Sequence, residues 1–518
     1  MSISAEKISD DVKAQPADAT SVPVRETRVV SRNEALSSYM VIAAAAFGLI
    51  SDGYQNNLMT MANVAFKQIY PKEYTSTVST RVSNALLVGE ILGQVFVGLL
   101  CDRVGRKAGL VVTTVMIVIG AILSTAAHGA HGSPEGLFWF LTIARGITGV
   151  GTGGEYPASS TSASEAANEK MIANRGPVFI MVTNFVLSFG GPLAVSVFLI
   201  VLAAAGENHL NTVWRVSFGI GIILPLTVFY FRMRMLSPKL YRDGAMKRRV
   251  PYWLAIKRYW KSLIGTCGAW FLYDFVTFPN GVFSGTIISS VIKNGSVLST
   301  GEWQLLLGAI ALPGVFVGAM LCNPFGRRNT MILGFSGYLI FGLIIGCAYD
   351  KITRIIPLFV VFYGLMQSFG NMGPGDMLGL VSAESYPTAI RGTCYGLSAA
   401  IGKTGAAVGT QAFTPIQTNL GKKWTFIIAA ICGVAGILVT YFFVPDKTGV
   451  DLADEDAKWL AYLKEQGWEG EIGEDDVMKL TREDSASDEV ELMSIVIFRP
   501  YFLCAASVVV HMHGLLTT

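Results

Sequence analysis

A single charged residue, Asp274, interrupts an otherwise uncharged run of twenty-eight residues from Gly265 to Ile292. Such a run is long enough to cross a bilayer, for which about 20 apolar residues suffice. A carboxylate at that depth costs roughly 2.5–3.5 kcal/mol, so it normally faces a partner or a water-filled path. Trp270, Asp274 and Phe278 follow one another at a spacing of four residues, which places an indole, an acid and a phenyl ring on one helical stripe. The pattern predicts one wall of a substrate-binding site.

Lys403 is the only charged residue between Gly392 and Ile416, and positions 399, 400, 406 and 407 around it are all alanine. These small neighbours leave room beside the ammonium for a bulky group. A buried ammonium without a partner on its own helix pairs with an acid from another helix or with an anionic ligand. Lysine binds phosphate well as a point charge. The sequence therefore predicts an anion site, with a permanent Lys403–Asp274 ion pair as the alternative.

Asp52, Tyr156 and Trp270 have two interpretations each, and Glu155 has one. Asp52 is the only charged residue from Leu36 to Val64, and it lies either in a buried path or, because three amides follow it, at a hydrated helix end. Glu155 follows a glycine-rich stretch, where closely packed helices would desolvate the acid and favour proton exchange. Tyr156 offers a hydroxyl to a ligand or acts as an interfacial anchor. Trp270 likewise either shapes the cavity or packs in the core.

The composition indicates which elements position these side chains. Apolar residues make up 52% of the chain and charged residues 15%, with 55 glycines among 518 residues, which suits closely packed membrane helices. The seven cysteines show no metal-ligand spacing. Long apolar runs separated by short polar breaks predict an all-α membrane protein with twelve transmembrane helices, at 36–64, 81–101, 108–128, 136–157, 176–204, 212–231, 263–292, 303–322, 330–349, 355–378, 392–416 and 424–444.

The polar segments predict the topology. Segment 1–35 lacks the features of a signal peptide, so we expect a cytosolic tail. The loop 232–262 contains ten Lys or Arg against a single acid, which marks the cytoplasmic face. It separates two six-helix halves, 36–231 and 263–444, and twelve spans place both termini on the cytoplasmic side. The last segment, 445–518, is expected to be an acidic, solvated cytosolic tail with an apolar end.

The two halves repeat each other in sequence. GLLCDRVGRK at 98–107 stands before the third span, and AMLCNPFGRRN at 319–329 stands before the ninth. Arg175 and Gly176 follow the fourth span as Arg391 and Gly392 follow the tenth, and the two pairs of segments are offset by 221 and 216 residues. Two six-helix halves in parallel register are typical of alternating-access transporters, which bind their substrate between the halves.

The first of these loops resembles the loop signature of the major facilitator superfamily. The matching residues are Gly98, Asp102, Arg103, Gly105, Arg106 and Lys107. Such a loop is expected to act as a gate, because an acid and the cations after it pair with helix ends and clamp neighbouring helices. Asn323 and Pro324 replace the Asp and Arg in the second copy, so the second clamp is expected to be weaker.

A narrower resemblance runs through the fourth, seventh and eleventh spans. RGITGVGTGGEYPASS, WFLYDFVTF and GLSAAIGKTGAAVG are similar to motifs of the proton-coupled phosphate symporters, and residues 36 to 470 most resemble the fungal glycerophosphodiester permeases. The resemblance implies that protons travel by Asp52, Glu155 and Asp274. It implies that the substrate is bound by Lys403, Tyr156, Trp270, Asp274, Phe278 and Asn184.

The chain departs from the phosphate symporters in ways that favour an esterified substrate. Phe278 stands where they carry a tyrosine, Glu155 replaces an aspartate, and Thr183 and Asn184 stand where they carry a glutamine. A diester has fewer anionic oxygens than free phosphate and carries two organic arms, so the loss of a donor suits it.

The resemblance implies a plasma-membrane transporter, not an enzyme, that imports a glycerophosphodiester such as glycerophosphoinositol or glycerophosphocholine together with protons. The alternatives are an inorganic phosphate symporter and a nutrient receptor that does not transport. We expect no cofactor, no nucleic-acid partner and no partner beyond the organophosphate, protons and the lipid bilayer. Asn294 begins a glycosylation sequon in an expected outer loop.

Overall fold

The computed structural model describes residues 32–170, 172–234, 241, 245–246, 250–292 and 296–468 of the chain. The expected N-terminal tail to residue 31, Asn294 and the apolar C-terminal end lie outside the described residues, as does part of the basic loop.

The helices of the first half follow in chain order. They are α1 (Arg32–Ile69), α2 (Ser76–Arg103), α3 (Arg106–Thr125), η1 (Ala130–Gly132), α4 (Pro134–Lys170), η2 (Ile172–Asn174), α5 (Arg175–Val182), α6 (Asn184–Ala205), η3 (Glu207–His209), α7 (Leu210–Ile220) and α8 (Ile223–Arg234).

The second half is built in the same way and is followed by a helix that packs on one end of the bundle and projects beyond it. Its elements are α10 (Tyr252–Val282), α11 (Ser284–Ser289), α12 (Val297–Ala311), α13 (Pro313–Leu321), α14 (Arg327–Cys347), α15 (Tyr349–Ile352), α16 (Ile356–Gly370), the π-helix η4 (Asn371–Gly375), α17 (Asp376–Glu384), α18 (Arg391–Asn419), α19 (Lys423–Phe443) and α20 (Leu452–Glu465).

Each of the twelve expected spans falls on one of these helices or on two or three consecutive pieces, so the predicted architecture is confirmed. Seven of the described helical segments are long and apolar enough, by length and composition alone, to cross a membrane. The others are broken into shorter helices, as at Ile356–Gly370, or carry more glycine or polar residues. Several spans are broken within the bundle, for example before Pro313 and around Pro374, because proline has no N–H to donate to the preceding turn.

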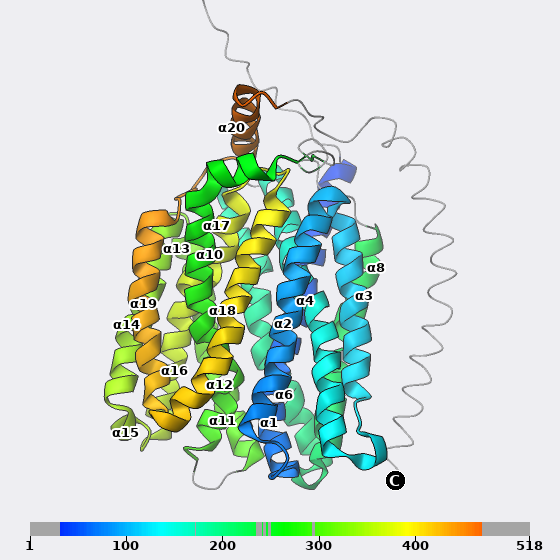
Figure 1. Ribbon diagram of the computed structural model, residues 1–518, viewed down its shortest axis with the longest axis vertical. Helices are drawn as coiled ribbons and strands as arrows, with labels where there is room; N and C mark the ends of the chain where they lie inside the picture. The colour runs from blue at the N-terminus through cyan, green and yellow to red at the C-terminus, as the bar shows by residue number, and fades with distance from the viewer. Residues whose placement is uncertain are drawn as a thin grey trace, which may run out of the picture.

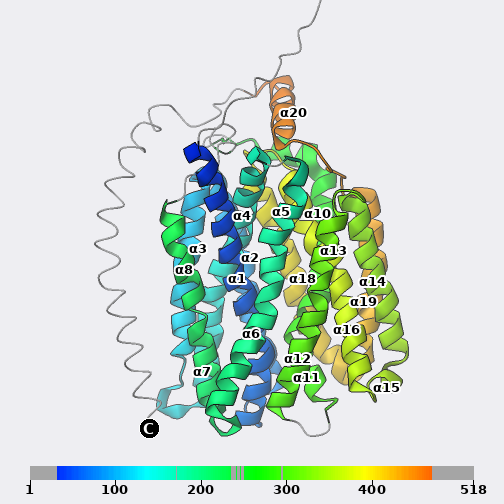
Figure 2. The ribbon, with the colours of Figure 1, turned by 180° about the vertical axis from the view of Figure 1, so that it is seen from behind.

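The helices form two bundles that stand side by side. In Figure 1 the first half lies on the right and the second half on the left, and Figure 2 shows the same division from behind. The halves meet where α2 lies against α18, α5 against α13 and α6 against α12. The site between the halves is therefore bounded by helices from both repeats.

Glycines allow the close contact between α2 and α4. A Cβ at Gly89 would lie 2.1 Å from the carbonyl oxygen of Gly146, and a Cβ at Gly149 would lie 2.1 Å from that of Leu86. Any larger residue would push the two backbones apart. The glycine-rich stretch of the fourth span is thus explained by helix packing.

Three predicted boundaries are wrong. Helix α4 continues to Lys170, thirteen residues past its expected end, and α10 begins at Tyr252, inside the expected basic loop. The segment from Leu452 to Glu465 was expected to be solvated tail but forms the packed helix α20, in which Trp459 is 1% exposed. These segments are polar enough to resemble loops, and they form helices because they pack on the end of the bundle that carries α20 (top in Figure 1). We call this end the α20 end.

Candidate functional site

A cavity of about 220 Å³ lies between the two halves. All six residues expected to bind substrate line it: Lys403, Tyr156, Trp270, Asp274, Phe278 and Asn184. They come from α4 and α6 of the first half and from α10 and α18 of the second. The cavity therefore joins residues far apart in the chain, such as Tyr156 and Lys403, which are 247 positions apart.

Lys403 is the centre of the polar contacts in this cavity. Its ammonium nitrogen lies 3.3 Å from Glu90 Oε2 and 4.0 Å from Asp274 Oδ2. It donates to the hydroxyl of Tyr156 at 3.5 Å and stands 3.6 Å from the centre of the Phe278 ring. The side chain is only 1% exposed, so two carboxylates and an aromatic face replace most of its hydration.

Close packing of α10 on α18 brings these groups together. A Cβ at Gly402 would lie 2.4 Å from the indole of Trp270, and one at Gly405 would lie 2.4 Å from the carbonyl oxygen of Phe271. The absence of side chains at these positions lets the helices approach. Trp270 packs edge-on against Tyr395, with ring centroids 5.6 Å apart, while it also lines the cavity, so both interpretations of this residue apply.

Glu90, on α2, is a functional candidate that the sequence analysis missed. It is fully buried and is the nearest acid to Lys403. The signal was present in the sequence, because Glu90 is the only acidic residue in the span expected at 81–101. Like Asp274, it is expected to face a partner or a water-filled path.

Asp52 connects to this acid through an amide. The Asn56 side-chain nitrogen donates to Asp52 Oδ1 at 2.7 Å and to Glu90 Oε1 at 2.8 Å. Asp52 is fully buried in the middle of α1, so the alternative of a hydrated helix end is wrong. Three acids, Asp52, Glu90 and Asp274, thus form a continuous polar path around Lys403.

Glu155 does not join this path. Its carboxylate receives both terminal nitrogens of Arg232, at 2.5 and 2.6 Å, and the hydroxyls of Thr113 at 2.6 Å and Ser159 at 2.9 Å. A buried bidentate ion pair with Arg232 compensates the charge of Glu155, and proton exchange at this acid stays a prediction. Arg232 was missed because it lies just after the expected end of the sixth span.

Tyr156 is placed in the middle of α4 and is 8% exposed. Its hydroxyl accepts from Lys403, so the alternative of an interfacial anchor is wrong. Asn184 begins α6 and donates to Asp376 Oδ1 at 2.6 Å, across the boundary between the halves. Asp376 also lines the cavity and was not singled out from the sequence.

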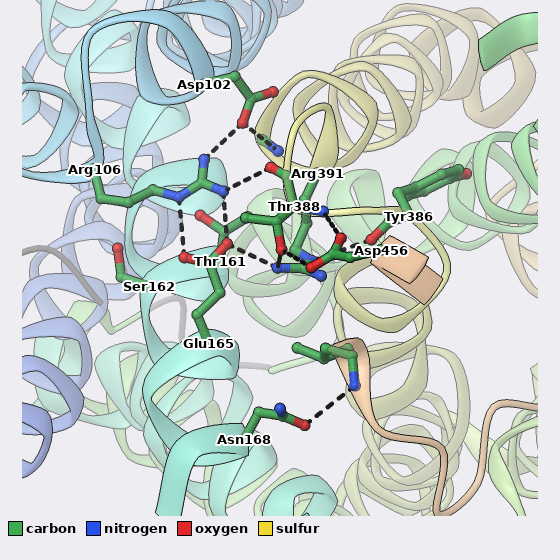
Figure 3. Close-up of polar contacts among 12 residues, drawn as sticks. Asp102, Arg106, Thr161, Ser162, Glu165, Asn168, Tyr386, Thr388, Arg391 and Asp456 are labelled. Atoms are coloured by element: carbon green, nitrogen blue, oxygen red, sulfur yellow. Dashed lines mark hydrogen bonds and ion pairs between the residues drawn. The ribbon is translucent and has the colours of Figure 1, made fainter. Parts of the chain in front are cut away.

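A second charged cluster lies near the α20 end, and its centre is shown in Figure 3. Asp102 Oδ1 accepts from Arg106 at 2.7 Å and from the backbone N–H of Gly392 at 3.0 Å, and Oδ2 accepts from the N–H of Thr393 at 2.6 Å. The acid thus binds the N-terminus of α18, where the helix dipole favours a negative charge. This is the contact with a helix end that the loop signature predicted.

The other residues of the loop signature have distinct places. Gly98 lies against α18, because a Cβ there would be 2.6 Å from the carbonyl oxygen of Gly392, and Gly105 has a positive φ of 141° that glycine adopts most readily. Arg103 is exposed and lies over the ring of Tyr252, 5.7 Å from its centre. Lys107 is half-buried.

Glu165 connects the two halves in this cluster. It accepts from Arg106 of the first half at 2.6 Å and from Arg391 of the second half at 2.8 Å (Figure 3). All three side chains are fully buried. The ion pairs therefore hold the halves together at the α20 end.

The second repeat makes the matching cluster. Glu384 accepts from Arg327 of its own half at 3.1 Å and from Arg175 of the first half at 2.7 Å. Arg327 also donates to Asn323 at 2.7 Å, in the place where Arg106 meets Asp102. Asn323, which stands in place of the acid, thus keeps the hydrogen bond but carries no charge.

Helix α20 covers this end of the bundle. Asp451 accepts from Asn168 of the first half at 2.9 Å, and Asp456 accepts from the N–H of Thr388 of the second half at 2.6 Å. Burial raises the pKa of Asp456 above its ordinary value. Because α20 and the residue before it contact both halves, this segment holds the halves together.

Glu455 adds a further contact from α20. It accepts from Tyr259 at 2.8 Å and from Lys447 at 2.8 Å. Although burial alone raises the pKa of Glu455, the bond and charge of Lys447 bring it below its ordinary value. The carboxylate is therefore held in its charged form.

Comparisons with known proteins agree with the architecture. The family model described as "Sugar (and other) transporter" matches residues 39–239 and 239–459. The chain is 55% identical over 463 residues to "Glycerophosphoinositol permease 1" of Candida albicans, covering 88% of each chain. It is 51% identical over 472 residues to "Glycerophosphoinositol transporter 1" of Saccharomyces cerevisiae, covering 90% of each. Among solved structures, the major facilitator superfamily proton:xylose symporter XylE matches with a TM-score of 0.68 and 19% identity, over 82% of this chain and all of that one.

Proposed function

Because this chain belongs to the sugar (and other) transporter family, we propose that it imports a glycerophosphodiester through the plasma membrane together with protons. Two relatives more than half identical to it are named as glycerophosphoinositol carriers. The observation that carries the proposal is the buried ammonium of Lys403 in the cavity between the halves. It offers a single positive charge to an anionic head, and aromatic and amide side chains surround it.

The balance of charges around Lys403 supports coupling to protons. One ammonium stands between the carboxylates of Glu90 and Asp274, at 3.3 and 4.0 Å. An anionic phosphodiester that approaches the ammonium meets these two acids, and the repulsion falls when one of them takes up a proton. Binding of the anion and binding of a proton therefore favour each other.

We assign the proton path to Asp52, Glu90 and Asp274, with Asn56 between the first two. Glu155, for which the family resemblance implies a proton role, is left out because a proton would have to displace Arg232 from it. The phosphoryl head is assigned to Lys403 with Tyr156, while Trp270 and Phe278 form the apolar wall beside it.

Alternating access then follows from the two halves. We place the α20 end in the cytosol, because the basic loop joins the halves there. In the described conformation the buried ion pairs close that end. One proton that moves with the membrane potential supplies about 2.3 kcal/mol per 100 mV, and a monoanionic diester needs more than one proton for electrogenic uptake.

The test is uptake of radiolabelled glycerophosphoinositol, glycerophosphocholine and inorganic phosphate into cells that lack other carriers for them. We expect concentrative uptake of a diester that collapses with a protonophore. Asp274→Asn should abolish accumulation while the protein remains at the cell surface. Accumulation of inorganic phosphate alone would favour the phosphate symporter, and binding of the diester without accumulation would favour a receptor. Normal accumulation by Asp274→Asn would sink the assigned proton path.

A further inference from the structure

A second polar contact bridges the cavity away from Lys403. The amide of Asn184, from α6 of the first half, donates to Asp376 Oδ1, from α17 of the second half, at 2.6 Å. Both residues line the same cavity as Lys403. The ion pairs of Lys403 are with Glu90 and Asp274, so Asp376 lies outside that group.

Asp376 has little compensation for its charge. It is 1% exposed, its Oδ2 has no hydrogen-bond donor, and among the described residues no Lys, Arg or His nitrogen lies within 4.0 Å. Oδ2 faces α13 closely, because a Cβ at Gly318 would lie 1.9 Å from it. A buried carboxylate with one donor is costly, and a donor supplied by a ligand would stabilise it.

The internal repeat relates this contact to the one at Lys403. With the offset of 216 to 221 residues between the halves, Tyr156 corresponds to the neighbourhood of Asp376, and Asn184 corresponds to that of Lys403. The Tyr156–Lys403 and Asn184–Asp376 hydrogen bonds are thus equivalent contacts between the halves. One is cationic and the other acidic, so the cavity has two chemically different poles for a ligand with two different parts.

We propose that Asp376 and Asn184 form a subsite for the hydroxyl groups of a polyol head group, so that the protein prefers an inositol-headed diester to a choline-headed one. This inference rests on the proposed function. Apart from Asn56, which bridges Asp52 and Glu90, four further carboxamides line the cavity and can exchange hydrogen bonds with hydroxyls in both directions: Asn57, Gln304, Gln367 and Asn371. A carboxylate that accepts from a hydroxyl makes the stronger, charge-assisted type of bond.

A choline head group fits these surroundings less well. A quaternary ammonium has no hydrogen to donate to carboxamides, and proteins recognise it mainly on aromatic faces. The Phe278 ring already carries the Lys403 ammonium at 3.6 Å, so a second cation there would be repelled. The two carboxylate oxygens of Asp376 lie against the side chain of Asn184 and against the backbone near Gly318. The remaining approach to these oxygens suits a small hydroxyl group.

The experiment compares kcat/KM for uptake of glycerophosphoinositol and glycerophosphocholine in the wild type and in Asp376→Asn, in cells without other carriers. We expect kcat/KM of the variant to fall at least tenfold for glycerophosphoinositol and less than threefold for glycerophosphocholine. The matched control is Glu302→Gln, an exposed acid on α12, which should leave both values unchanged. Retained glycerophosphocholine uptake also shows that the variant is folded. Should Asp376→Asn not reach the membrane, Asn184→Ser is scored by the same ratio.

The outcomes separate this inference from the proposed function. A loss confined to glycerophosphoinositol supports the polyol subsite. An equal loss for both diesters, a loss confined to glycerophosphocholine, or no change overturns it, while uptake of the diesters by the wild type still upholds the proposed function. If the wild type carries neither diester, the proposed function fails first.

Discussion

Replacement of Glu90 by Gln gives the sharpest test of how substrate and protons are coupled. In the wild type, Glu90 lies 3.3 Å from the Lys403 nitrogen, with Asp274 at 4.0 Å on the same ammonium. The substitution keeps the shape of the side chain and removes one negative charge. Lys403 keeps Asp274 as its counter-ion, so no buried ammonium is left unpaired.

The size of the effect follows from the distances. A phosphoryl oxygen that binds the ammonium at about 3 Å, opposite Glu90, lies about 6 Å from the Glu90 carboxylate. At an effective dielectric constant of about 20, two negative charges at that separation repel by about 3 kcal/mol. This corresponds to roughly a 100-fold difference in affinity between the wild type with a charged Glu90 and the neutral variant Glu90→Gln.

The assay is the KM for diester uptake at one external pH, together with the accumulation ratio. The KM of Glu90→Gln should lie below that of the wild type by up to about 100-fold, because the repulsion between this carboxylate and the diester is absent. Accumulation should fall, because a proton no longer travels with the anion, while exchange of internal for external diester continues. Glu302→Gln serves as the charge-matched control on an exposed site. A KM of Glu90→Gln equal to or above that of the wild type would refute this assignment.

Three other substitutions probe the remaining contacts. Lys403→Gln should raise the KM at least tenfold, or about 1.4 kcal/mol, and a fall in maximum rate alone would instead indicate a structural ion pair. Phe278→Tyr adds a hydroxyl that can donate to free phosphate but is left unpaired beside an organic arm of a diester. The ratio of phosphate uptake to diester uptake should therefore rise about fivefold or more. An unchanged ratio means that Phe278 does not face the phosphoryl group. Asp456→Asn should weaken the bonds to Thr388 and speed hydrogen exchange in α20, and unaltered exchange would show that other contacts hold the helix.

The sequence predicted the spans well because apolar runs separated by polar breaks leave few alternatives in a membrane. It also predicted the members of the cavity that stand out as lone polar groups, such as Asp274 and Lys403. What it did not predict is pairing. Glu155 looked unpartnered because Arg232 is seventy-seven residues away in the chain, and only the fold brings them together.

Glu90 and Asp376 were missed for a different reason. Each is a lone acid in an apolar span, so the argument made for Asp274 applied to them equally. Helix α20 was hidden by its composition. Its buried positions Leu452, Glu455, Trp459 and Leu463 follow a helical spacing, but the many charges between them resemble a solvated tail.

The shared acids at the α20 end affect how readily the two halves can part. Glu165 is bound by Arg106 of its own half and by Arg391 of the other. When the halves separate, Arg391 leaves but Arg106 stays. The acid therefore does not become an unpaired buried charge, which would cost about 3–5 kcal/mol.

The same holds for Glu384, which keeps Arg327 when Arg175 departs. Of the ions in these two clusters, opening releases the guanidinium groups of Arg391 and Arg175, which water entering the widening gap can hydrate. We therefore expect these ion pairs to add little to the barrier to opening, while the bonds of Asp102 to α18 and the contacts made by α20 must still break. The ion pairs of Glu165 and Glu384 can thus hold the α20 end closed and still allow the two halves to separate there.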